Sequence, residues 1–167
     1  QKGGLLPNFL AVTNMKLSNM QLIREGNERV LAARLADARF FFDEDRKTPL
    51  SSRVEKQQAV TFQQKLGSLR QKTTRVVALA SAIAQRLGDA SLVEDARRAA
   101  ELCKADLLTG IVGEFPTLQG VMGGEYAAHD GERPSVSQAI REQYMPRAME
   151  GDLPESLAGK VLSLADR

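Results

Sequence analysis

The chain has 167 residues, 43% of them apolar and 26% charged, and a net charge of only +2. These values are typical of a globular domain with its own core and exclude a long disordered chain. No apolar run approaches the roughly 18–20 residues that span a bilayer, so no membrane partner is expected. The single cysteine, Cys103, excludes an internal disulfide framework and indicates a reducing, cytoplasmic setting. Because the chain starts at Gln1 without an initiator methionine, we expect it to come from a longer protein.

Residues 1–26 are expected to form an N-terminal arm, or to belong to a preceding domain. Within them, the alternation of Phe9 and Ala11 with Leu10 and Val12 allows at most one short strand over residues 9–13. A lone strand cannot satisfy its own backbone, so its partners would lie outside the chain or it would pack as an irregular arm.

Helical periodicity begins after Asn27, a favourable N-cap, and continues to the break at Pro49. A second helix is predicted over residues 51–66. A third ends before Gly88, which suits the position just after a helix, and a fourth runs from about Ser91 to Leu107. The stripe of the first helix comprises Leu31, Leu35, Ala38 and Phe42.

The glycines after residue 109 do not match a phosphate-binding loop and are expected to permit turns and close contacts between helices. A short helix is predicted around residues 118–128. Pro134 and Pro154 would each open a further helix, ending near Tyr144 and Asp166. Residues 27–167 are therefore predicted to form one all-α domain of six to eight helices.

Candidate catalytic residues are few. His129 precedes Asp130, a pair that can ligate a metal, but a single histidine in a loop favours simple hydrogen bonding. Cys103 lies on an apolar helix face, which indicates a buried thiol rather than a nucleophile. Asp106 and Asp166 are acids on otherwise apolar stripes and need partners.

Charge is unevenly distributed along the chain. Residues 1–75 hold 14 Lys and Arg against 7 Asp and Glu, a local excess of +7. Long cations with neighbouring glutamines suit contacts to phosphate and sugar, although a solvated polar surface is an equally open interpretation. The cations that we expect to face outward and to make such contacts are Arg46, Lys47, Arg53, Lys56, Lys65 and Arg70.

Several short motifs follow one another along nearly the whole chain, in order and without large gaps. They lie in residues 26–31, 34–42, 62–69, 104–107, 114–115, 119–123, 129–132 and 144–147. Together these motifs resemble one family, the β subunit of the bacterial tetrameric glycyl-tRNA synthetase.

In that family two α and two β subunits assemble, and the α subunit charges tRNA with glycine using ATP and Mg²⁺. The resemblance therefore implies three partners: the tRNA for glycine, the α subunit and the rest of the β subunit. It implies no cofactor for this segment, which corresponds to a helical domain related to the HD phosphohydrolases.

By that relation, the four metal-site positions of the HD superfamily fall on Lys72, Ala105, Asp106 and Asp166. Both histidines are replaced, so the resemblance implies no metal, no catalysis and a remnant cluster of lysine and aspartate. The expected function is a non-catalytic, tRNA-handling module. The alternatives are a purely structural helical spacer and, less in keeping with these replacements, a metal-dependent phosphohydrolase.

Overall fold

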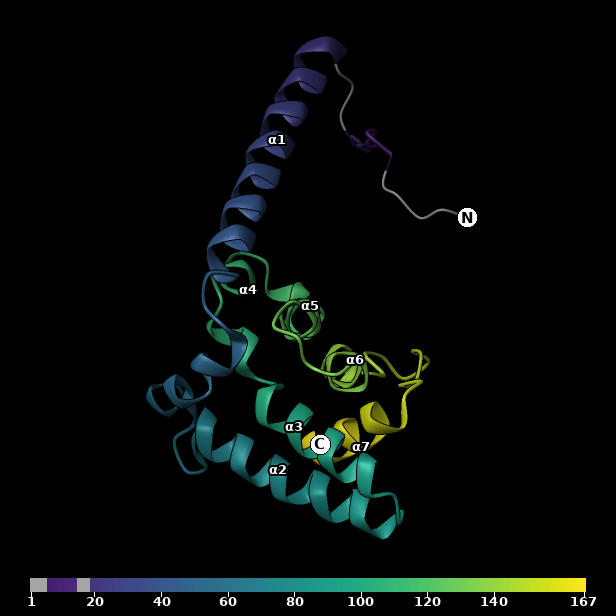
Figure 1. Ribbon diagram of the computed structural model, residues 1–167. Coiled ribbons are helices and arrows are strands. Elements are labelled where there is room, and N and C mark those ends of the chain that lie inside the picture. Colours follow the sequence, from purple (N-terminus) through teal and green to yellow (C-terminus); the bar gives the residue numbers. More distant parts are fainter. Residues whose placement is uncertain (1–5, 15–18) are drawn as a thin grey trace. The chain divides into compact units, whose positions relative to one another are not determined.

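The computed structural model describes residues 6–14 and 19–167 (Figure 1). Within these residues, seven α-helices and several short 3-10 turns dominate, and one two-stranded hairpin accompanies them. The predicted predominance of helix is therefore confirmed. The chain divides into two compact units, Gln1–Arg39 and Phe40–Arg167. The boundary expected after residue 26 lies inside the first helix.

Helix α1 (Met20–Asp45) begins seven residues before the predicted N-cap at Asn27. Asn19 supplies the cap instead, since its side-chain oxygen accepts a hydrogen bond from the backbone N–H of Leu22 at 3.1 Å. Residues 9–13 adopt no strand, so the short strand that their alternation allows does not form. Alternation alone does not make a strand where no second strand pairs with it.

The predicted apolar stripe lies along helix α1, but it is not buried along the whole length of the helix. Leu31 and Leu35 are 40% and 62% exposed, whereas Phe42, in the last turn, packs against the core of the second unit. Periodicity reports which residues share a face. It does not report whether another element covers that face.

The helix predicted over residues 51–66 is absent. Two 3-10 turns, η1 (Leu50–Arg53) and η2 (Glu55–Ala59), lead into a hairpin of β1 (Thr61–Gln63) and β2 (Gly67–Ser68). The strands are antiparallel, with Thr61 opposite Ser68 and Gln63 opposite Gly67. Gly67 has φ +90°, a conformation that few other residues adopt, so it allows the chain to turn from β1 into β2.

Helix α2 (Leu69–Arg86) starts and stops on local sequence signals. The side chains of Ser68 and Gln71 form a reciprocal capping box at its N-terminus. Gly88, with φ +78°, follows its C-terminus as predicted. Helix α3 (Ala90–Leu102) is shorter than expected, because the chain turns at Cys103 and Lys104 into η3 (Ala105–Leu108).

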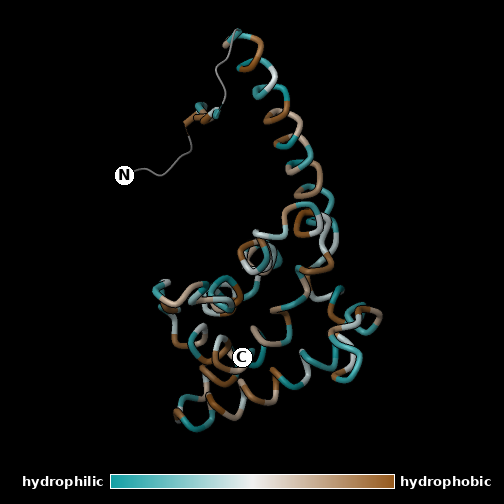
Figure 2. Tube along the Cα trace, turned by 180° about the vertical axis from the view of Figure 1, so that it is seen from behind, coloured by the Kyte–Doolittle hydropathy of each residue, from teal (hydrophilic) through white to brown (hydrophobic). Residues whose placement is uncertain are grey.

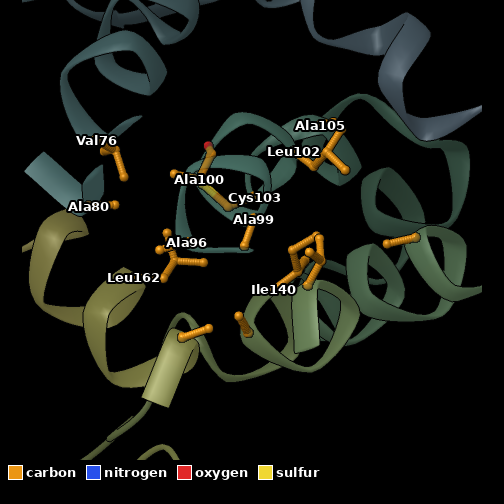
Figure 3. Close-up of a cluster of buried hydrophobic side chains, with 14 of the residues drawn as sticks. Val76, Ala80, Ala96, Ala99, Ala100, Leu102, Cys103, Ala105, Ile140 and Leu162 are labelled. Atoms are coloured by element: carbon orange, nitrogen blue, oxygen red, sulfur yellow. The ribbon is translucent and has the colours of Figure 1, made fainter. Parts of the chain in front are cut away.

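The core lies where α2 and α3 meet α6 (Pro134–Glu142) and α7 (Leu157–Asp166). Figure 3 shows its small side chains on α3, facing Val76 and Ala80 of α2 and the larger Ile140 and Leu162. Alanines let the helices approach closely. Each fully buried Leu or Ile contributes about 1.5–3 kcal/mol. Along the helices of this unit, hydrophobic and hydrophilic segments alternate as amphipathic packing requires (Figure 2).

The remaining helices are α4 (Gly110–Glu114), η4 (Pro116–Leu118) and α5 (Val121–His129). The glycines before and within α5 have the predicted roles. Gly120 turns the chain with φ +80°, and a Cβ on Gly124 would lie 2.8 Å from the backbone oxygen of Ser137 in α6. Among the helices of the described chain, none is long and apolar enough to cross a membrane.

Candidate functional site

A buried ion-pair cluster joins three helical segments of the second unit. Asp166, in the last turn of α7, receives Lys104 Nζ at 2.6 Å on Oδ2 and Lys72 Nζ at 2.9 Å on Oδ1. Lys72 also donates to the backbone oxygen of Asp166 at 3.0 Å. The structure thus brings Lys72 and Asp166 together, although 94 positions separate them in the sequence.

Lys104 is the most enclosed member of the cluster, with only 4% of its surface exposed. Its ammonium donates to Gln143 Oε1 at 2.9 Å and lies 4.1 Å from the centre of the Tyr144 ring. Burial alone would lower the pKa of Lys104, but neighbouring acidic groups, Asp166 among them, raise it. The ammonium therefore stays charged at neutral pH.

Lys72 is the more open of the two cations. Its ammonium pairs with Asp166. The same ammonium lies 4.9 Å from the centre of the ring of Phe62, a residue of strand β1. A cation on an aromatic face gains about 0.5–1 kcal/mol at exposed sites. The cluster therefore ties the hairpin and α2 to the end of α7.

Asp106 lies close by but has other partners. Its Oδ2 accepts the backbone N–H groups of Gly120 at 2.6 Å and Gly123 at 3.2 Å, at the start of α5. Its Oδ1 has no hydrogen-bond partner, and the residue is fully buried. Burial raises the pKa of this carboxyl to about 6, although the two amides and Lys104 oppose the shift. Ala105 is also fully buried.

The chemistry of this cluster is that of a structural ion pair. Two ammonium groups contact one carboxylate, so protein cations already neutralise the charge of Asp166. Among the described residues, no group of three or more His, Cys, Asp or Glu side chains is arranged so that it could hold a metal ion. Sequence reasoning gave no role to Lys104, Gln143 or Tyr144, although Lys104 and Tyr144 lie in two of the segments that carry the family resemblance.

Arg53 corrects the expectation that all six candidate cations face outward. It is 8% exposed, and its guanidinium donates to the backbone oxygens of Thr48 at 2.6 Å and Asp45 at 2.9 Å. The Asp45 carboxylate in turn accepts the backbone N–H groups of Gly110 and Ile111, each at 2.9 Å. Arg53 and Asp45 therefore join the end of α1 to α4.

The other five candidates lie at the surface in different electrostatic settings. Lys47 pairs with Glu44, and Arg70 pairs with Glu55 at 2.9 Å. Lys56 and Lys65 are exposed and have no acidic partner among the described residues. The positive charge available to a polyanion is therefore smaller than the number of lysines and arginines indicates.

Arg46, the remaining candidate, lies against His129 rather than an acid. Its guanidinium is 3.0 Å from His129 Nδ1 and 5.0 Å from the centre of the Phe42 ring. The neighbouring Asp130 accepts the backbone N–H of Leu50 at 2.6 Å. His129 and Asp130 thus form hydrogen bonds, as predicted, but they lie at the C-terminal end of helix α5 and not in a loop.

The family model that matches the chain describes a subunit of an aminoacyl-tRNA synthetase. The family model for the glycyl-tRNA synthetase beta subunit matches residues 1–167. The chain therefore belongs to the glycyl-tRNA synthetase β-subunit family, as the sequence motifs indicated.

Among its relatives, the glycine–tRNA ligase beta subunit of Geobacter sp. strain M21 is 51% identical over 166 residues, which cover 99% of this chain and 24% of that protein. The corresponding subunit of Trichlorobacter lovleyi is 52% identical over 167 residues, which cover 100% of this chain and 24% of that subunit. That of Moorella thermoacetica is 52% identical over 167 residues, with 99% and 24% covered. The chain spans about a quarter of the length of these relatives.

Proposed function

We propose that this segment is a non-catalytic module that handles tRNA within the β subunit of a cytoplasmic glycyl-tRNA synthetase. Its partners are the tRNA for glycine, the α subunit and the rest of the β subunit. The complex attaches glycine to tRNA with ATP and Mg²⁺, and this segment binds neither. Family membership over the whole chain is the observation that carries the proposal.

The surface cations support a direct contact with RNA. Arg46, Lys56 and Lys65 are exposed and not neutralised by a carboxylate, while Lys47 and Arg70 exchange exposed acidic partners for phosphate at little cost. Phosphate contacts position a nucleic acid without reading its sequence. Arg53 supports this surface from within, through Asp45.

We further propose that the second unit is a degenerate relative of the HD phosphohydrolases, with Lys72, Ala105, Asp106 and Asp166 at the four former metal positions. The ammonium groups of Lys72 and Lys104 beside Asp166 support the degenerate character of such a site, because they would repel a bound cation. Elemental analysis of the full β subunit should show no stoichiometric Mn, Fe or Zn. A metal that is lost in Asp106→Ala, or phosphohydrolase activity, would restore the enzyme hypothesis.

The test of tRNA handling uses the complete complex of α and full-length β subunits. Arg46, Lys56 and Lys65 are replaced by Gln, and the dissociation constant for tRNA is measured by gel-shift titration. The matched control replaces Arg86, Arg97 and Lys160, three exposed cations elsewhere in the second unit, and so removes the same charge. We expect weaker binding in the first variant only. Equal affinity of both variants and the unchanged complex would favour the structural spacer.

A further inference from the structure

A shallow groove runs between the tip of the hairpin and the first turns of α2. Its walls come from the turn that joins β1 to β2 and from the outward face of the helix. The residues that line it are Gln64, Lys65, Leu66, Gly67, Gln71, Thr74 and Arg75. No acidic side chain is among them, although Asp and Glu make up 21 of the 167 residues.

The two cations of this groove are available to a ligand. Lys65 and Arg75 are both exposed, and neither has an ion-pair partner among the described residues. Their neighbours on the same elements differ, since Arg70 is paired with Glu55 and Lys72 with Asp166. The unneutralised positive charge of the hairpin and the start of α2 is thus concentrated in one concave place.

The groove also presents one side-chain hydrogen-bond donor, which the capping box holds in place. The Oε1 atom of Gln71 accepts the backbone N–H of Ser68 at 2.9 Å in the capping box, so its amide Nε2 remains free to donate. A side chain on Gly67 would overlap the Gln71 carboxamide, so the glycine leaves room for Gln71 to take its position in the groove. The N-terminal end of an 18-residue helix adds a positive field to the same place.

We propose that this groove binds the phosphodiester backbone of tRNA, with Lys65 and Arg75 neutralising phosphates and Gln71 Nε2 donating a hydrogen bond. The inference rests on the proposed tRNA-handling function and adds Arg75 and Gln71 to it. A shallow, open, cationic groove suits an extended backbone. It does not enclose a base or a small molecule, which needs a deeper and more apolar pocket.

The experiment compares three complexes of α with full-length β subunits: unchanged, Lys65→Gln with Arg75→Gln, and Arg86→Gln with Lys160→Gln as a charge-matched control. Arg86 lies at the opposite end of α2, about 16 Å from Arg75 at 1.5 Å per residue. The tRNA dissociation constant is measured at two salt concentrations. ATP binding, measured by calorimetry, is a second arm because ATP carries the same phosphate chemistry.

The groove variant should bind tRNA more weakly, by about fivefold for each phosphate that is no longer neutralised at 0.15 M salt. The slope of log affinity against log salt should fall by about 0.7–0.9 for each such phosphate. The control variant should keep its affinity, and ATP binding should be unchanged in both. Unchanged tRNA affinity in the groove variant, or weakened ATP binding alone, overturns the proposal.

Failure of the groove and failure of the proposed function give different results. If Arg46, Lys56 and Lys65 matter together but the pair of Lys65 and Arg75 does not, tRNA handling stands and the groove is wrong. If neither variant differs from its control, the proposed function fails as well. Far-UV circular dichroism confirms that each variant keeps its helices.

Discussion

The ammonium of Lys104 lies 2.6 Å from Oδ2 of Asp166, and only 5% and 11% of the two side chains are exposed. An ion pair so enclosed has lost most of its hydration, so each partner depends on the other. Lys72 shares the same carboxylate from a more open position. The pair therefore fixes the end of α7 against the start of η3.

Replacing Lys104 by Met should lower the free energy of unfolding by about 3–5 kcal/mol, because it leaves a buried carboxylate with one cation fewer. The double variant Lys104→Met with Asp166→Leu should recover most of that loss, since both buried charges are then gone. Chemical denaturation of the chain measures both. A double variant no more stable than the single one would contradict a dominant role for the ion pair.

Gly159 has no room for a side chain. A Cβ there would overlap Oε2 of Glu142 and lie 2.7 Å from Oγ of Ser156, the N-cap of α7. Gly159→Ala should therefore destabilise the fold by about 2 kcal/mol, as expected for overpacking. Gly113→Ala is the matched control, because a Cβ there meets nothing within 4 Å. Equal melting temperatures for the two variants would show that the end of α6 and the start of α7 can move apart freely.

The buried Asp106 carboxyl predicts a pH dependence of stability. Its pKa is raised from 3.8 in the unfolded chain to about 6, mainly by burial, so the folded state holds the proton more tightly. The protonated carboxyl contributes roughly 3 kcal/mol to the free energy of unfolding below pH 4. This contribution is lost as the pH rises through 6.

Asp106→Asn should remove this component of the pH dependence. The unfolding free energies of the unchanged protein and the Asp106→Asn variant should be compared as a function of pH. Their difference should change between pH 4 and 6 and stay constant outside that range. If the two curves run parallel from pH 4 to 7, the carboxyl does not titrate as its burial predicts.

Arg53 and Lys56 lie three positions apart, but replacing them should affect the free energy of unfolding very differently. Arg53→Ala should lower the free energy of unfolding by about 3 kcal/mol, because it leaves the buried Asp45 carboxylate without its cation. Lys56→Ala, at an exposed position, should change it by no more than about 0.5 kcal/mol. Denaturant titration of both distinguishes a structural arginine from a surface lysine. Similar values for the two would argue against the buried pair.

The parts of the fold that the sequence predicted well depend on local signals. Gly88 ends α2 and Pro134 opens α6, each through the conformation of its own backbone. The segment 51–66 was mispredicted because its conformation depends on distant partners. Arg53 turns inward to Asp45, and the buried Gln57 accepts a hydrogen bond from Thr73 at 2.9 Å.

The candidate site shows the same division. Asp106 and Asp166 are acids on apolar stripes, and this pattern predicted that each needs a partner. The pattern did not predict which residues those partners are. Lys104 gains its role from Asp166, 62 positions away, and no local pattern reveals an interaction of that range. Likewise, the number of cations could not show that Arg53 is buried or that Arg70 is paired.

The salt dependence of tRNA binding by the complex that carries Arg46→Gln, Lys56→Gln and Lys65→Gln is the decisive measurement for the tRNA-handling function. If these cations neutralise phosphates, the slope of log affinity against log salt falls by about 0.7–0.9 for each phosphate left without its cation. The Arg86, Arg97 and Lys160 control keeps the slope of the unchanged complex. A triple variant with the same affinity and the same slope as the unchanged complex would contradict tRNA handling and leave this segment a structural spacer.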